Sequence, residues 1–248
     1  MVECGKNDSD RKTGLARRLE SSTRKALYDY KMVESVETLA VALSGGKDSI
    51  TLLHLLHAIS GRGFPPFKLV AINVQGEFSC GAGVQVSFLR SLCDKLSVPL
   101  LILESHQKLE SLECYSCSRE RRSLIFQAAK EAGATTIAFG HHRDDSAETL
   151  LMNLLNKGEF AANLPLIHMA AYGITIIRPL IYLAEEDIRT YAIQQGFARI
   201  TCQCPVGQRS KRRQVKDLLR ELEELYPNAT ANIASAGLLY GSDKASRP

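Results

Sequence analysis

A short loop in the first quarter of the chain carries residue types that bind phosphate. It reads Ser-Gly-Gly-Lys-Asp-Ser and lies between an apolar stretch at 38–43 and a helical pattern at 48–59. Glycines let the backbone turn tightly and bring its N–H groups to an anion, and the positive end of the following helix faces the same place. The lysine adds a positive charge, and the aspartate is a candidate ligand for Mg²⁺. The predicted phosphate-binding residues are Ser44, Gly45, Gly46, Lys47, Asp48 and Ser49.

A plain glycine turn that caps a helix is the alternative interpretation of this loop. The strand, loop and helix follow one another in register, which favours phosphate binding over that alternative. The loop lacks the G-x-x-x-x-G-K-[ST] spacing of ordinary nucleotide triphosphatases, so a different class of nucleotide enzyme is indicated.

A second polar segment reads Gly140-His141-His142-Arg143-Asp144-Asp145. It follows an apolar strand pattern at 135–139 and opens a helical pattern at 144–156. In a parallel sheet the end of this strand lies on the same edge as the phosphate-binding loop. Carboxylates and imidazoles at that edge could bind a metal ion or transfer protons, and Asp144 and Asp145 are the candidates. Simple capping of the helix by these two aspartates is the alternative.

Four of the seven cysteines form two close pairs, Cys114/Cys117 and Cys202/Cys204. Seven cysteines are too few for a disulfide scaffold of this length, and paired thiols in a cytosolic chain indicate metal or redox chemistry. Taken alone, the four suggest a structural Cys₄ zinc site, with C-x-C as a tight half-site. The remaining cysteines are interpreted as packing or incidental residues: Cys4, Cys80 and Cys93.

Short apolar strands alternate with helices through the first two thirds of the chain, which is typical of a doubly wound parallel α/β sheet. The strands are expected at 38–43, 68–74, 99–103, 135–140 and 174–177. The helices are expected at 15–34, 48–59, 84–96, 119–132, 144–156, 184–195 and 209–226. We therefore divide the chain into an N-terminal basic helical segment (1–34), a nucleotide-binding domain (35–182) and a C-terminal helical region (183–248).

The composition is that of an ordinary globular protein, with 45% hydrophobic and 23% charged residues among 248. No stretch approaches the roughly 20 apolar residues of a membrane span, and the polar N-terminus does not resemble a signal peptide, so we expect a cytoplasmic protein. The net charge of +4 is concentrated in basic groups that could bind phosphates or simply form solvated helix faces. The candidate residues for such phosphate contacts are Arg121, Arg122, Arg209, Lys211, Arg212, Arg213 and Lys216.

The Ser44–Ser49 loop resembles the PP-loop of the N-type ATP pyrophosphatases, which cleave ATP between the α- and β-phosphates and adenylate an oxygen of the substrate. The Gly140 segment resembles the Gly-His-x-x-Asp-Asp segment of the tRNA-modifying PP-loop proteins. The C-x-x-C pair, the Ile177-Arg178-Pro179-Leu180 stretch and Arg213-Gln214-Val215 are similar to those of the tRNA 2-thiocytidine synthetases (TtcA type). This resemblance covers roughly residues 15–238.

The resemblance implies an adenine nucleotide alpha hydrolase-like fold and an ATP-dependent enzyme that thiolates cytidine 32 of tRNA. It implies catalytic roles for Lys47, Asp48, Asp144 and Asp145, and ATP contacts at Gly140 and His141 in addition to the loop. It also implies Mg²⁺ at Asp48 and a [4Fe–4S] cluster on Cys114, Cys117 and one late cysteine, for which Cys204 is favoured and Cys202 is the alternative. The expected partners are tRNA and a sulfur donor such as a cysteine desulfurase.

Three features depart from the family pattern. The second strand ends in Asn73-Val74-Gln75, where an acidic residue is expected, and the following loop, Gly76 to Gly83, lacks the family's usual sequence. The late cysteines form C-x-C where many relatives have C-x-x-C. A tRNA 2-thiouridine synthetase and a non-catalytic, zinc-stabilised tRNA-binding protein are the alternative functions. The sequence leaves open the tRNA set, the immediate sulfur donor and whether the protein is a homodimer.

Overall fold

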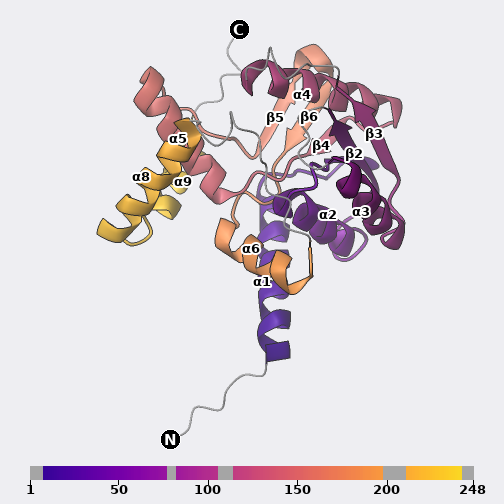
Figure 1. The fold of residues 1–248 in the computed structure, drawn as a ribbon, viewed down its shortest axis with the longest axis horizontal. Coiled ribbons are helices and arrows are strands. Elements are labelled where there is room, and N and C mark those ends of the chain that lie inside the picture. Colours follow the sequence, from indigo (N-terminus) through magenta and orange to yellow (C-terminus); the bar gives the residue numbers. More distant parts are fainter. Residues whose placement is uncertain (1–7, 77–81, 106–113, 198–210, 242–248) are drawn as a thin grey trace, which may run out of the picture.

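A six-stranded sheet forms the centre of the protein, seen in a computed structural model that describes residues 8–76, 82–105, 114–197 and 211–241 (Figure 1). The strand order is β3-β2-β1-β4-β6-β5. The strands are β1 (Thr38–Ala42), β2 (Lys68–Gln75), β3 (Leu100–Glu104), β4 (Thr136–Ala138), β5 (Leu166–Met169) and β6 (Ile174–Ile177). All neighbouring pairs are parallel except β5 with β6, which is antiparallel. The direction of the winding reverses between β1 and β4, where doubly wound sheets bind their ligands.

Helices connect the strands and extend the chain beyond the sheet. They are α1 (Asp8–Asp29), α2 (Lys47–Ile59), α3 (Ala82–Lys95), α4 (Cys114–Glu131), α5 (Arg143–Lys157), α6 (Glu185–Gln194), α8 (Lys211–Leu225) and α9 (Ala229–Tyr240). None of the helices within the described ranges is both long and apolar enough to cross a bilayer.

The two faces of the sheet are buried by different helices. In β1, Leu39 and Val41 point into a cluster with buried residues of α1, α2, α3 and α6. Ala40 and Ala42 point to the opposite face, where α4 packs through residues such as Phe126. This alternation within one strand follows from the period of two of a β-strand, and it explains why β1 is apolar throughout.

The helices α5, α8 and α9 form a separate group beside the sheet (Figure 1). Ala147, Val215, Leu219 and Ala234 make its small buried cluster. Helix α9 packs closely on α5 and on the segment that follows it: an added Cβ at Gly237 would lie 3.3 Å from Leu150 Cδ2 and 2.9 Å from the Cβ of Ala162. This packing fixes α8 to α5, whose first turn carries the Asp144–Asp145 pair.

The predicted fold class is confirmed, with differences in detail. The edge strand β5 was not expected, and because it is antiparallel the sheet is mixed rather than wholly parallel. Helix α9 was not expected either. Helix α4 begins at Cys114, so the C-x-x-C pair lies within its first turn and not before it. Helix α1 packs into the cluster that also contains β1 and α2, so the N-terminal segment shares the central core.

Candidate active site

The Ser44–Ser49 loop connects β1 to α2 and leaves the start of α2 open. Gly45 has a φ of 86°, a left-handed conformation that favours glycine. Ser49 Oγ lies 3.1 Å from Ser44 Oγ and donates to the carbonyl of Gly46 at 3.0 Å. Gly46 is the N-cap of α2, and no described side chain caps this helix. The N–H groups of its first turn are therefore available to an anion.

The end of β2 supports the entrance of this loop. Asn73 is buried, and its side-chain amide donates to the carbonyl of Leu43 at 2.6 Å. The amide thus stands where an acidic residue was expected and ties β2 to the residue that precedes the loop.

Gly140 brings the second motif against the loop. A Cβ built at this position would lie 3.1 Å from the carbonyl carbon of Asp48 and 3.1 Å from the backbone nitrogen of Ser49. Such distances are too short for an ordinary Cβ contact, and the neighbours are backbone atoms that cannot rotate away. Glycine at 140 therefore permits β4 and the loop to meet at the point where the sheet reverses direction.

His142 caps α5 and faces the phosphate-binding loop. Its Nδ1 accepts the backbone N–H of Asp145 at 3.4 Å, while Asp145 Oδ2 accepts the backbone N–H of His142 at 3.0 Å. The acceptor role of Nδ1 places the ring proton on Nε2, which lies 3.4 Å from Asp145 Oδ2 and 3.7 Å from Asp48 Oδ1. Asp145 thus takes part in helix capping, as the alternative interpretation held, and also faces Asp48 across the imidazole.

A cavity of about 300 Å³ opens between the loop, α5, α6 and α8. It is lined by Asp48, His142, Asp145, Glu148, Glu185, Arg212, Arg213 and Lys216. Four carboxylates and three cations share this space, and Lys47 reaches Glu185 at its edge. The cavity therefore joins the two predicted motifs to a helix from the C-terminal region.

Glu185, the first residue of α6, holds two lysines. Lys47 Nζ lies 3.0 Å from its Oε1, and Lys216 Nζ donates to its Oε2. Burial alone would raise the pKa of Glu185, but the hydrogen bond from Lys216 and the charge of Lys47 outweigh it and lower the pKa to about 2. For Lys47, burial alone would lower the pKa. The negative charges of Asp48 and Glu185 outweigh burial and raise the pKa; the Asp48 carboxylate lies 3.1 Å from Lys47 Nζ. Both groups are therefore charged at neutral pH.

Arg212 of α8 pairs with two carboxylates of α5. Its Nε donates to Glu148 Oε2 at 2.8 Å, and its NH2 nitrogen lies 3.2 Å from Asp145 Oδ1. Burial raises the pKa of Glu148 although Arg212 opposes the rise. Burial would raise the pKa of Asp145 too, but there His142, His141 and Arg212 prevail and lower it. Arg212 therefore compensates the buried negative charge of α5.

His141 follows Gly140 with its Nδ1 buried and without a hydrogen-bond partner among the described residues. Burial, and then the charge of Arg178, lower its pKa to about 3. The ring is consequently neutral at physiological pH and can offer an uncharged acceptor to a ligand.

The candidate tRNA-binding residues are dispersed by the fold. Arg121 and Arg122 lie on α4, on the other face of the sheet from α2. On α8, Lys211 and Arg213 are exposed, and the cavity is lined by Arg212, Lys216 and also Arg213. Arg209, Cys202 and Cys204 lie outside the described residues, as do the side chains of Cys114 and Cys117. Glu185 was not predicted, because an acid at a helix start is ordinary in sequence terms.

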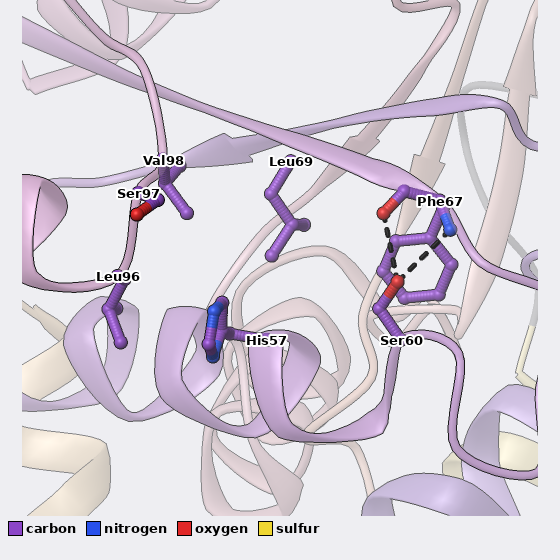
Figure 2. A pocket seen from close by; sticks show the side chains of 7 residues that line it. All are labelled: His57, Ser60, Phe67, Leu69, Leu96, Ser97 and Val98. Atoms are coloured by element: carbon purple, nitrogen blue, oxygen red, sulfur yellow. Dashed lines mark hydrogen bonds between the residues drawn. The ribbon is translucent and has the colours of Figure 1, made fainter.

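A second cavity of about 240 Å³ lies at the other end of α2 (Figure 2). Its lining includes His57 and Ser60, whose hydroxyl accepts from the N–H of Phe67 at 3.0 Å and donates to the carbonyl of Phe67 at 2.9 Å. Since α2 spans about 20 Å, this cavity is separated from the phosphate-binding loop. Its paired hydrogen bonds fix the turn that leads into β2.

The fold and site define a class of protein by two features. An α/β sheet reverses its direction of winding between β1 and β4, and at that point a glycine loop and the N-terminus of α2 face a charged cavity. A family model described as PP-loop domain matches residues 15–220. The tRNA-cytidine(32) 2-sulfurtransferase of Dechloromonas aromatica is 35% identical over 231 residues, which cover 90% of this chain and 79% of that protein. That of Anaeromyxobacter dehalogenans is 38% identical over 232 residues, with the same coverage.

The chain therefore belongs to the PP-loop family, in the group of the tRNA-cytidine(32) 2-sulfurtransferases. Among solved structures, it is similar to the U34-tRNA thiolase NcsA from Methanococcus maripaludis with its [4Fe-4S] cluster. The TM-score is 0.73 at 22% identity, with coverage of 91% of this chain and 78% of that one. At this identity the likeness supports the fold alone.

Proposed function

We propose that this chain is an ATP-dependent tRNA thiolase that adenylates the C2 oxygen of a pyrimidine and replaces it with sulfur, with cytidine 32 as its target. The observation that carries the proposal is the open N-terminus of α2 beside Lys47, at the same edge as the Asp144–Asp145 pair. The names of the relatives supply the substrate and the nucleotide position.

The chemistry requires activation because the C2 oxygen of cytosine is a poor leaving group. Transfer of AMP to that oxygen releases pyrophosphate and turns the oxygen into a good leaving group. A sulfur nucleophile then attacks C2, and AMP departs with the oxygen. The loop N–H groups and Lys47 would stabilise the charge that develops on the departing pyrophosphate.

Mg²⁺ fits the residues around Asp48. Its Oδ1 is buried and accepts no hydrogen bond among the described residues, although Lys47 Nζ lies 3.1 Å from it and His142 Nε2 lies 3.7 Å from it. The described ranges hold no ready group of three or more His, Cys, Asp or Glu side chains for a metal ion. Mg²⁺ bound to a nucleotide needs only one or two carboxylates, because phosphates and water complete its shell. We assign this role to Asp48, with Asp144 or Asp145 as the second carboxylate or the proton acceptor.

A [4Fe–4S] cluster fits the position of the first cysteine pair. Cys114 and Cys117 lie in the first turn of α4, three positions apart in the chain. Because α4 follows β3 in a parallel arrangement, its start lies at the same edge of the sheet as the phosphate-binding loop. Cys114, Cys117 and Cys204, or alternatively Cys202, would hold the cluster, which would supply a means of delivering sulfur to the activated base. The sulfur itself would come from a donor such as a cysteine desulfurase.

The tRNA contacts are assigned to the exposed cations of α8, in particular Lys211 and Arg213. Arg213 has 62% of its side chain exposed and lies 3.6 Å from Asp217. Arg212 is held by Asp145 and Glu148, so we place it in the support of α8 rather than at the RNA surface.

Mass spectrometry of tRNA nucleosides from a strain that lacks the gene tests this function. Restoring the chain should restore 2-thiocytidine, and Lys47→Ala or Asp48→Ala should not restore it. Glu186→Ala is the control, because this exposed residue forms an ion pair with Arg189 and does not line the cavity. Appearance of 2-thiouridine instead would favour the alternative synthetase. Full thiolation by both loop variants would exclude the loop from the reaction.

A further inference from the structure

One carboxylate bridges the phosphate-binding loop to α8. Glu185 binds Lys47 of the loop and Lys216 of α8 through separate oxygens, and the three side chains are only 25–30% exposed. Its own position is fixed, since its backbone N–H donates to Asp144 Oδ2 at 3.0 Å and α6 packs on α1 and α2. The lysines reach Glu185 through flexible side chains, so they can move while the carboxylate stays.

This arrangement sets up a competition for Lys47. The loop offers its N–H groups to phosphate, yet the ammonium that should accompany them is bound to Glu185 and Asp48. A polyphosphate that enters the loop presents a stronger negative charge to the same ammonium. Lys47 can then transfer from Glu185 to phosphate at little cost, because Lys216 remains to neutralise Glu185.

We propose that Glu185 is a positioning residue that holds Lys47 until a nucleotide phosphate replaces it, and that Lys216 sets the strength of this hold. The inference rests on the proposed function, since it presumes that ATP is the phosphate ligand. Because Lys216 neutralises part of the negative charge of Glu185, it weakens the attraction between Glu185 and Lys47. Glu185 thereby links the loop to α8, the helix whose exposed side is assigned to tRNA.

ATP binding in the absence of tRNA tests the proposal, with a non-cleavable ATP analogue and Mg²⁺ followed by calorimetry. Glu185→Gln removes the competing charge and should tighten binding about three- to tenfold, the range expected for a partly exposed ion pair. In Lys216→Met, Glu185 keeps Lys47 but loses Lys216 as an ion-pair partner, so it should hold Lys47 more strongly and weaken binding of the ATP analogue. In the Glu185→Gln background this weakening should shrink to that caused by Lys211→Met, a matched loss of a lysine charge on the same helix at a position that does not line the cavity. Glu186→Gln should behave as wild type.

The positioning role has a kinetic signature as well. Glu185→Gln should lower KM for ATP without raising kcat. Glu185→Asp, whose carboxylate reaches the lysines less well, should have a KM between those of the wild type and Glu185→Gln. The Asp variant keeps the charge at the start of α6 and serves if the Gln variant is unstable.

Two results would overturn the proposal. Unchanged or weaker binding by both Glu185 variants would show that Lys47 is not in competition. A Lys216→Met effect of equal size in both backgrounds would show that Lys216 contacts phosphate directly. Failure of the wild-type protein to bind the analogue would instead refute the proposed function.

Discussion

The Arg212–Glu148 pair gives a prediction whose size follows from burial. The Glu148 side chain is 6% exposed and that of Arg212 is 42% exposed. Removing one partner of a fully buried pair costs about 3–5 kcal/mol, and removing one of an exposed pair costs about 1 kcal/mol or less. Arg212→Met should therefore lower the free energy of unfolding by about 1–3 kcal/mol at pH 7. Urea denaturation measures this loss.

The pH dependence identifies the cause. The folded pKa of Glu148 is raised above 4.5, so its ionisation lowers stability as the pH increases from 4.5 through the folded pKa. Without Arg212 that pKa rises further, so the deficit of the variant should be larger at pH 7 than at pH 5. Asp145 also loses the charge of Arg212, which helps to lower its pKa against the effect of burial, so any rise in that pKa acts in the same direction.

Two further variants separate charge compensation from packing. Glu148→Gln in the Arg212→Met background removes the uncompensated carboxylate and should recover part of the loss. Arg213→Met, at an exposed neighbouring position, should change stability by no more than about 0.5 kcal/mol. An Arg212→Met protein as stable as wild type at both pH values would refute the idea that this guanidinium docks α8 on α5.

The site makes other predictions. Gly140→Ala should weaken ATP binding about tenfold or more in calorimetry, because its Cβ would displace the loop backbone, whereas Gly14→Ala, with open space around it, should not. Arg213→Gln should reduce the slope of log tRNA affinity against log salt by about 1; an unchanged slope would make this residue a solvated surface group. Because the pKa of Glu185 is about 2, its ion pairs stabilise the fold above pH 4.5 and are lost as the pH falls toward 2. In Glu185→Gln the free energy of unfolding should therefore depend less on pH over that range. Serine at Cys114 or Cys117 should abolish both the iron–sulfur absorbance and thiolation after anaerobic reconstitution, and tightly bound zinc with full activity in air would contradict the cluster.

The sequence predicts those parts of the fold and site that depend on local patterns. The phosphate-binding loop and the start of α5 were found because each follows an apolar strand and carries its own turn and capping residues. Strand β5 was missed because its four residues are partly exposed and lie at the edge of the sheet. Helix α9 was missed because it is rich in small residues, which suit close packing on α5 but give little amphipathic pattern.

The roles of the α8 cations could not be read from the sequence. Lys211–Lys216 form one basic run, but the packing of Val215 and Leu219 decides which cations face the cavity. Arg212 thereby meets Glu148, 64 residues away along the chain, and Lys216 meets Glu185, 31 residues away. Such pairs follow from tertiary packing, whereas the exposed position of Arg213 agrees with the surface role expected for the run.

The fate of the C2 oxygen tests the central claim most directly. The reconstituted protein would be given ATP, sulfide and a tRNA whose cytidine 32 carries ¹⁸O at C2, and the AMP would be analysed by mass spectrometry. Adenylation of that oxygen predicts AMP that contains one ¹⁸O for each 2-thiocytidine formed. Thiolated tRNA accompanied by unlabelled AMP would contradict the account, because the oxygen would then leave without having been joined to the nucleotide.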